Sequence, residues 1–256
     1  MATASSAVPM LDATFVHEKR STTTKAVEIV TSPASDIRVI DPSEYRRAAQ
    51  CLAEAFADDH IVRYPIDTPD RAHWTDEEKW ALHVDAFEYI TYAHCIKGMV
   101  TTIGPDFDCV ALWMPPGQDI DDLLTTIRSG LWRLHYKLSA QGRQRFFSEF
   151  LPLLGETKTS ALGGRDADSW YLVYIGTKPG SRGRGYCRKL IEHVTTQADA
   201  EGKACYLESS HATNLTIYEK MGFQAVKQVH LQEEAGCTMD IMIREPIAKA
   251  YGGKTL

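Results

Sequence analysis

The chain has 256 residues, of which 44% are hydrophobic and 24% charged, a composition typical of a globular protein. Its 28 lysines and arginines face 34 aspartates and glutamates, so the formal net charge is −6. This balance argues against a sequence-independent nucleic-acid binder, because such proteins usually carry a basic excess. No apolar run approaches the ~20 residues that a transmembrane helix needs, so we expect no membrane partner.

The six cysteines are scattered along the chain, with no C-x-x-C pair and no tight spacing to histidine. This pattern predicts neither a metal site nor a disulfide framework. We therefore expect a reducing, cytoplasmic location. Residues 1–34 are rich in serine, threonine and alanine and lack a continuous apolar segment. That composition favours a disordered N-terminal arm over a secretory signal.

One domain is expected over residues 35–246, with a tail at 247–256. It begins with a β-branched run at Asp36–Ile40, which predicts a strand. Helices are expected after Asp41 and after Thr75, because each is followed three residues later by a glutamate that completes a capping box. The second helix should end at Gly98. Two strand-like runs then predict a hairpin over residues 99–117.

From residue 119 to about 154, leucine and isoleucine recur every three to four positions, which predicts a helical insertion, and residues 157–168 read as a loop. The last third alternates, with strands expected over 170–177 and 204–210 and helices over 182–200 and 214–222. Two further strands should pair around a turn at Ala235 and Gly236. A strand–helix–strand crossover implies one parallel pair in an otherwise antiparallel sheet.

The junction after the 170–177 strand is rich in glycine and arginine, with glycines at 180, 183 and 185. A helix that starts near Gly183 would present unpaired N–H groups and a partial positive charge to a phosphate. Arg182 and Arg184 could add charge-assisted hydrogen bonds. The spacing matches neither the nucleoside-triphosphate loop nor the dinucleotide motif. Taken alone, the stretch is also compatible with an ordinary glycine turn.

The segment "RGRGYC", Arg182 to Cys187, resembles the [Q/R]-x-x-G-x-[G/A] signature of the GNAT superfamily of N-acetyltransferases. Cys187 stands where the family usually has glycine or alanine. The segments "AEAFADD", "ALWMPPG", "WYLVYIGTKPGSRGRG" and "YLESSHATNLTIYEKMGF" resemble, in that order, the puromycin N-acetyltransferase-like branch. The resemblance extends from about Asp36 to Arg244 and is strongest from Trp170 onward.

This resemblance implies the GNAT fold, an α/β (α+β) architecture. Its central sheet is mixed and mostly antiparallel, a parallel strand pair splays apart, and helices cover both faces. It also implies acetyl-CoA as the acetyl donor. The pantetheine arm would pair with the splayed strand at Tyr174, Ile175, Gly176 and Thr177. Glycine at 176 would mark a bulge or a close backbone approach. The pyrophosphate would lie on Arg182, Gly183, Arg184, Gly185, Tyr186 and Cys187.

The resemblance also suggests catalytic groups. Tyr218 matches the family tyrosine that protonates the departing thiolate, and a phenol suits that task. Asn214 would contact the cofactor arm or serve as a helix N-cap. Glu208, at the end of a strand beside the splay, is the first choice for the general base, because burial would raise its pKa. The alternatives are His211, the group of Asp58, Asp59 and His60, and a water chain.

The expected activity is direct transfer of acetyl from acetyl-CoA to a primary amine of a small molecule, such as an antibiotic, a toxin or an amino-acid-like amine. The alternatives are an idle acyl-CoA sensor and an acetyltransferase for protein lysines or N-termini. The insertion is expected to shape the acceptor pocket. An aromatic wall for the acceptor is a further hypothesis and would involve Trp113, Trp132, Tyr136 and Trp170. The sequence is compatible with a monomer or a homodimer.

Overall fold

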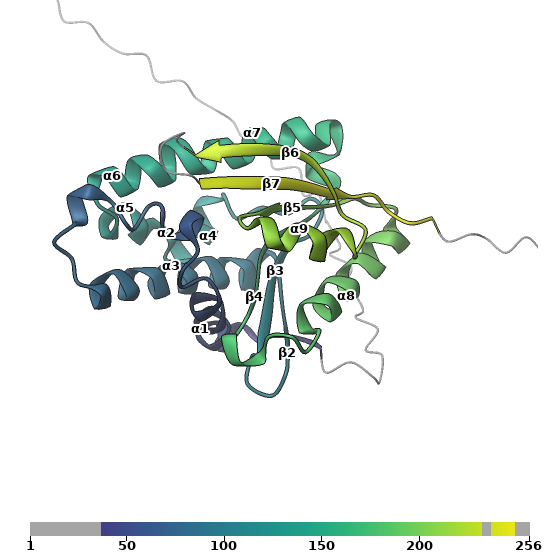
Figure 1. Cartoon of the computed structure of the whole chain (residues 1–256), viewed down its shortest axis with the longest axis horizontal. Coiled ribbons are helices and arrows are strands. Elements are labelled where there is room, and N and C mark those ends of the chain that lie inside the picture. Colours follow the sequence, from purple (N-terminus) through teal and green to yellow (C-terminus); the bar gives the residue numbers. More distant parts are fainter. Residues whose placement is uncertain (1–36, 232–236, 249–256) are drawn as a thin grey trace, which may run out of the picture. The chain divides into compact units, whose positions relative to one another are not determined.

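The computed structural model describes residues 37–231 and 237–248. Within this part, seven strands form one sheet in the order β1-β2-β3-β4-β5-β7-β6 (Figure 1). Among the described strands, β4 and β5 are the one parallel pair. The predicted fold class is thereby confirmed. The predictions for residues 1–34, for the turn at Ala235 and Gly236, and for residues 249–256 lie outside the described residues.

The strands are β1 (Arg38–Val39), β2 (Met99–Ile103), β3 (Cys109–Met114), β4 (Trp170–Thr177), β5 (Cys205–Ser209), β6 (Gln224–Leu231) and β7 (Cys237–Arg244). The α-helices are α1 (Tyr45–Ala55), α2 (His60–Arg63), α3 (Asp76–Lys97), α4 (Leu123–Ser129), α5 (Leu134–Lys137), α6 (Ala140–Arg143), α7 (Leu151–Leu162), α8 (Tyr186–Glu201) and α9 (Ala212–Glu219). Along the described stretches, no helix joins the length and apolar character that a bilayer crossing requires.

Both predicted capping boxes are present. The Asp41 side chain accepts from the Ser43 N–H at 2.8 Å, and Glu44 accepts from the Asp41 N–H at 2.9 Å. A short 3₁₀ turn at Pro42–Glu44 separates this box from α1. Thr75 and Glu78 cap α3 in the same reciprocal way, and α3 ends before Gly98 as expected. Each box satisfies N–H groups that a helix start leaves without a partner.

Helices cover both faces of the sheet (Figure 1). On one face, α1 and α3 bury a cluster centred on Leu52, Phe87 and Leu112. On the other, α8 and α9 pack against β3, β4 and β5 through residues such as Leu190 and Trp113. These two layers fix the position of β4, which contributes side chains to both.

The insertion is helical, but it is not the regular helix that its spacing suggests. Gly130, with φ +86°, ends α4, and Gln144–Phe150 form a π-helical stretch before α7. Leu134 and Leu138 are buried, whereas Leu123, Leu124 and Ile127 are exposed. The loop predicted at 157–168 is wrong, because α7 continues to Leu162 and a 3₁₀ helix follows. A glycine in the left-handed region ends a helix, even where the apolar spacing in the sequence continues beyond it.

A bulge in β4 changes which of its side chains face which layer. Leu112 of β3 pairs with Tyr174, but the next residue, Trp113, pairs with Leu172, so Val173 is the extra residue. Before the bulge, Leu172 belongs to the core under α8, and after it Ile175 does. Tyr174 instead packs with the α1–α3 cluster. One inserted residue thus reverses the alternation of the strand.

Gly176 has a different role from the bulge. It pairs with Val110 in register, and a Cβ atom built on it would lie 2.6 Å from Cβ of Ala55 and 3.1 Å from Cδ2 of Leu52. Its backbone carbonyl also accepts from the Cys51 thiol at 3.7 Å. The expected close approach is therefore real, but the approaching group is helix α1. The glycine lets α1 lie directly on β4.

Replacing Gly176 by alanine should therefore destabilise the fold. The added methyl group would overlap α1, and such overpacking costs about 1–3 kcal/mol of unfolding free energy. Urea denaturation measures this directly. Gly180→Ala is the matched control, because nothing lies within 4 Å of its Cβ position. An undiminished stability of Gly176→Ala would show that α1 is not held against this strand.

Candidate active site

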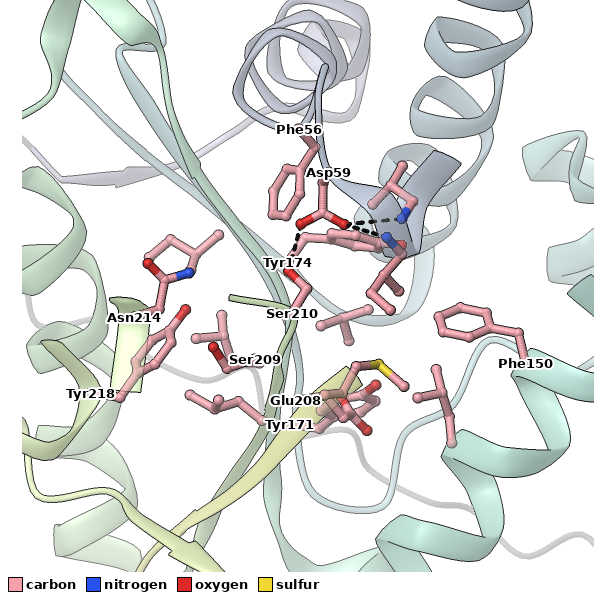
Figure 2. A pocket seen from close by; sticks show the side chains of 18 residues that line it. Phe56, Asp59, Phe150, Tyr171, Tyr174, Glu208, Ser209, Ser210, Asn214 and Tyr218 are labelled. Carbon is pink, nitrogen blue, oxygen red and sulfur yellow. Dashed lines mark hydrogen bonds between the residues drawn. The ribbon is translucent and has the colours of Figure 1, made fainter. Parts of the chain in front are cut away.

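A cavity of about 100 Å³ opens where β4 and β5 separate (Figure 2). The parallel pairing stops after Leu172 and Leu207, so the two strands diverge beyond that point. Besides the two strands, the cavity walls come from the segment after α1, from the start of α7 and from α9; they include Phe56, Asp59, Phe150, Leu154, Asn214 and Tyr218. The splay that the resemblance implied is therefore present, and it creates the cavity.

Beyond Leu172, the edge of β4 that faces the cavity is not paired with β5. From Tyr174 to Thr177 it pairs with β3 on one side, while no pairing with β5 is formed. Tyr174 and Ile175 line the cavity. Gly176 and Thr177 continue the strand outside the cavity, and the Thr177 hydroxyl points toward the Cys109 sulfur at 3.1 Å. Free backbone groups of this kind suit an extended amide-containing arm such as pantetheine.

The glycine-rich loop leads from β4 to α8. Gly183 and Gly185 have φ angles of +80° and +75°, and nothing lies within 4 Å of either Cβ position. Glycine is therefore favoured at both positions by the left-handed backbone conformation and not by a close neighbour, and the space around both Cβ positions is open. The helix begins at Tyr186 rather than near Gly183 as predicted. No side chain caps this helix start within the described residues, so no capping side chain competes with a ligand for its first N–H groups.

The side chains around this loop fit a diphosphate. Arg182 and Arg184 are exposed, and their guanidinium groups donate long hydrogen bonds of 3.4–3.5 Å to backbone carbonyls. Tyr186 and Cys187 are half-buried under the loop. Burial raises the pKa of Cys187 to about 11, so the thiol stays protonated near neutrality. This agrees with its expected role as a small loop residue.

One anchor of this loop was not predicted. The Ser181 hydroxyl donates to Oδ1 of Asp108 at 2.8 Å, and both residues are buried. Asp108 belongs to the β2–β3 connection, and its carbonyl also accepts from the Lys178 N–H at 2.9 Å. The loop is thus fixed to the hairpin from below. No local spacing links these residues, because they lie 73 positions apart in the chain.

Glu208 lies at the splay, between the two sides of the cavity. Burial raises the pKa of its carboxyl group to about 7, and the nearby hydroxyls of Tyr171 and Tyr206 only partly offset this effect. Its Oε1 atom is buried and has no hydrogen-bond partner among the described residues. A carboxylate with this pKa and a free oxygen is suited to accept a proton near neutral pH.

Tyr218 and Asn214 project from α9 on one side of the cavity (Figure 2). Tyr218 is buried, and its ring contacts Phe223 with centroids 5.9 Å apart. Burial, with a smaller effect of the Cys187 and Cys109 thiols, raises its pKa well above the ordinary value, so the phenol is protonated at neutral pH. Asn214 is not the N-cap of α9, because His211 occupies that position.

Among the alternative bases, the structure brings one into the cavity. Asp59 lines it, but its oxygens are already used: Oδ1 accepts from the N–H groups of Ile61 and Val62, and Oδ2 accepts from the Ser210 hydroxyl at 2.5 Å (Figure 2). Asp59 thus caps α2 and links it to the end of β5. Asp58, His60 and His211 are exposed and do not line the cavity.

The aromatic-wall hypothesis is wrong. Trp113 and Trp170 are core residues in edge-to-face contact, with centroids 6.3 Å apart. Trp132 and Tyr136 lie exposed on the insertion and do not reach the cavity. The lining of the cavity includes instead residues that sequence reasoning did not select, namely Val62, Phe150, Leu154, Tyr171 and Met239. Two of them, Phe150 and Leu154, come from the insertion that was expected to shape the acceptor pocket.

Comparison with known proteins agrees with this geometry. The profile of the acetyltransferase (GNAT) domain matches residues 155–225. An uncharacterized N-acetyltransferase of Schizosaccharomyces pombe is 46% identical over 209 residues, which are 81% of this chain and 82% of that protein.

Solved structures with the same fold are much less similar in sequence. A mosquito arylalkylamine N-acetyltransferase-like protein has a TM-score of 0.53 at 12% identity and covers 82% of this chain and 98% of its own. A Corynebacterium glutamicum acetyltransferase related to histone acetyltransferases has a TM-score of 0.52 at 19% identity, covering 84% and 98%. A Drosophila melanogaster polyamine N-acetyltransferase, which forms N-acetylagmatine, has a TM-score of 0.50 at 12% identity, covering 82% and 98%. With its curated relative and its domain match, the chain belongs to the GNAT superfamily of N-acetyltransferases.

Proposed function

We propose that this acetyltransferase transfers the acetyl group of acetyl-CoA directly to the primary amine of a small molecule. The observation that carries the proposal is the cavity at the splay, where Glu208, Tyr218 and the unpaired side of β4 meet. Two proteins with the same fold are named for small amines, which supports this acceptor class. The ordered sequence segments support the puromycin N-acetyltransferase-like branch.

The donor would be held by the residues that the resemblance indicates. Its pyrophosphate suits the N–H groups from Gly183 to Cys187 and the guanidinium groups of Arg182 and Arg184. Its pantetheine arm suits the free side of β4 from Tyr174 to Thr177, with Asn214 across the cavity. Acetyl-CoA supplies an activated thioester. The protein's part is to place that thioester between Glu208 and Tyr218.

Two proton transfers complete the reaction. The neutral amine nitrogen forms a bond to the thioester carbonyl carbon, and the bond from that carbon to sulfur breaks. Glu208 accepts the proton that the amine loses, directly or through one water. Tyr218 donates its proton to the departing sulfur and is afterwards reprotonated from solvent. Both groups line the same cavity, so the two transfers occur within a single site.

The alternative acceptors fit this cavity less well. A protein lysine or N-terminus would need a wide groove, but the cavity has only about 100 Å³ of free volume, and Phe150 and Leu154 of the insertion form part of its wall. A sensor that only binds acyl-CoA would need neither a carboxylate with a pKa of about 7 nor a buried phenol at the splay. Both groups support an acetyltransferase for small amines.

The cradle can be tested by calorimetric titration with acetyl-CoA, with NADH as comparator. We expect acetyl-CoA to bind and NADH not to bind. Gly185→Val should raise the Kd of acetyl-CoA by about tenfold or more. Valine disfavours the φ of +75°, so the loop would shift and its N–H groups would lose contacts to the diphosphate worth ~1–3 kcal/mol. Gly202→Val is the matched control: it carries a similar φ of +67° at the other end of α8. Equal loss of affinity in both variants would assign the effect to strain and not to the cradle.

A further inference from the structure

A second cavity adjoins the first on its acceptor side and has about 40 Å³ of free volume. Four residues line both cavities and form the wall between them: Ile61, Val62, Phe150 and Tyr174. At about 10–15 Å³ for each water-sized group, the second cavity has room for about three such groups. The two spaces are therefore neighbouring chambers with a common wall.

The rings of Tyr174 and Phe150 are the aromatic part of the wall between the chambers. Tyr174 is held by edge-on contacts to Phe56 and Phe87, with centroids 5.4 Å and 5.2 Å apart. Phe150 leans on Phe146 at 6.1 Å, within the π-helical stretch. Figure 2 shows Phe150 reaching toward the first chamber from the side opposite Asn214 and Tyr218. The second chamber thus adjoins the wall of the first chamber that lies opposite Asn214 and Tyr218.

The second chamber is apolar. Beyond the shared wall it is lined mainly by side chains of α3 and of the insertion, including Leu82, Ala86, Ile90, Leu134, Leu138 and Phe146. No charged residue is among its lining residues. A cavity of this character does not bind water well and favours an apolar occupant. A second ammonium group would be buried there without a partner, which is costly.

The first chamber, in contrast, has acidic side chains in its lining. Its lining includes two carboxylates, Asp59 and Glu208, and no lysine or arginine. The Asp59 oxygens are engaged by the N–H groups at the start of α2 and by Ser210, so the group with a free oxygen is Glu208. The site is therefore polar and acidic where the amine would react and apolar on the far side of Tyr174 and Phe150.

From this arrangement we infer that the acceptor is a primary monoamine with an apolar tail, alkyl or arylalkyl. Its amino group lies at Glu208, and its tail passes between Tyr174 and Phe150 into the second chamber. The inference rests on the proposed function and narrows its substrate class. It excludes diamines and polyamines as preferred acceptors, because their second ammonium would enter the apolar chamber.

The test is a set of amine pairs, each with one member that has an apolar tail and one that carries a second cationic group, assayed by acetyl-CoA-dependent thiol release at one pH. Hexylamine should exceed 1,6-diaminohexane in kcat/KM by at least about 100-fold, and phenethylamine should similarly exceed agmatine. Along propylamine, butylamine, pentylamine and hexylamine, kcat/KM should rise by about fourfold for each methylene until the chamber is full. Equal rates within each pair, or faster diamines, would overturn the inference.

A variant that fills the chamber locates the effect. Ala86→Leu adds apolar volume inside the second chamber, whereas Ala81→Leu changes an exposed position of the same helix, α3. Ala86→Leu should abolish most of the gain in kcat/KM from propylamine to hexylamine. Ala81→Leu should behave as wild type. An unchanged chain-length profile in Ala86→Leu would place the tail elsewhere and overturn the inference.

Failure of the proposed function has a different signature. If no amine of any kind releases thiol, the small-molecule assignment itself fails. If short amines and polyamines are acetylated without an apolar preference, the assignment stands and the tail inference falls. A readout without acetyl-CoA separates the two further: N-hexylacetamide should bind the protein alone in calorimetry, and more weakly to Ala86→Leu than to Ala81→Leu.

Discussion

Glu208→Gln is expected to lower kcat by roughly 100-fold to 10,000-fold, the range that a general base usually contributes. The amide has nearly the same shape but cannot accept the amine proton. In the wild type, the carboxylate fraction increases as the pH rises through about 7, so kcat/KM should climb across this interval. This rise of kcat/KM with pH should be missing in the variant. Steady-state thiol release from roughly pH 6 to 9 measures both effects.

Glu219→Gln is the control, since Glu219 is an exposed carboxylate at the end of α9. It should leave the rate and the pH profile unchanged. If Glu208→Gln kept both the rate and the limb near pH 7, the base would have to be another group that lines the cavity, such as Asp59, or a water chain.

The same substitution has a consequence for stability that does not depend on catalysis. The pKa of Glu208 is about 7 in the folded protein against an ordinary value of 4.5. The folded state therefore binds this proton more tightly than the unfolded state. The stability that the bound proton contributes is full below pH 4.5 and is lost as the pH rises to about 7. Glutamine stays neutral, so the variant should be more stable than the wild type at pH 8, by about 3 kcal/mol. Denaturation at pH 5 and pH 8 checks the sign.

Tyr218→Phe should lower kcat by about 100-fold and change the Kd of acetyl-CoA by less than about twofold. The ring and its packing against Phe223 remain, and only the proton for the departing sulfur is lost. Because burial raises the pKa of Tyr218 far above neutrality, the wild-type phenol stays protonated, and no pH limb between 6 and 9 should disappear with it. Calorimetry and steady-state rates separate the two constants.

The acid role can be tested more sharply by changing the leaving group. An acetyl donor with an aryl thiol has a more acidic leaving sulfur, which needs less help from an acid. The defect of Tyr218→Phe should therefore shrink with such a donor. Tyr92→Phe, a half-buried tyrosine of α3 that stacks on Tyr45, serves as control. A defect of the same size with both donors would make Tyr218 a packing residue.

The features that sequence predicted well are those fixed by neighbouring residues. The capping boxes at Asp41 and Thr75 depend on side chains three positions away, so their pattern is visible along the chain. The resemblance to the GNAT superfamily predicted the splay between β4 and β5, where Glu208, Asn214 and Tyr218 line the cavity. The predicted helix start near Gly183 was wrong by three residues, because two left-handed glycines continue the turn to Tyr186.

The features that sequence could not supply depend on distant contacts. Gly176 looks like a bulge residue until α1, more than 120 positions earlier, is placed on it. The second chamber combines α3 with Leu134, Leu138 and Phe150 of the insertion. Leu134 and Leu138 belong to the same apolar repeat as Leu123 and Leu124, which are exposed. Apolar periodicity marks a candidate face, but it does not say what covers that face.

The separation of β4 from β5 leaves an edge strand inside the molecule. Edge strands readily pair with other polypeptides, and proteins usually block them with lysine, proline or a bulge. The segment from Val173 to Thr177 contains neither lysine nor proline, and its bulge lies at the first of these residues. Part of this edge is covered instead: Val173, Tyr174 and Ile175 line the cavity, whose other walls include Phe150, Asn214 and Tyr218. The walls that form the cavity thus also shield part of an edge that would otherwise be open to pairing with another chain.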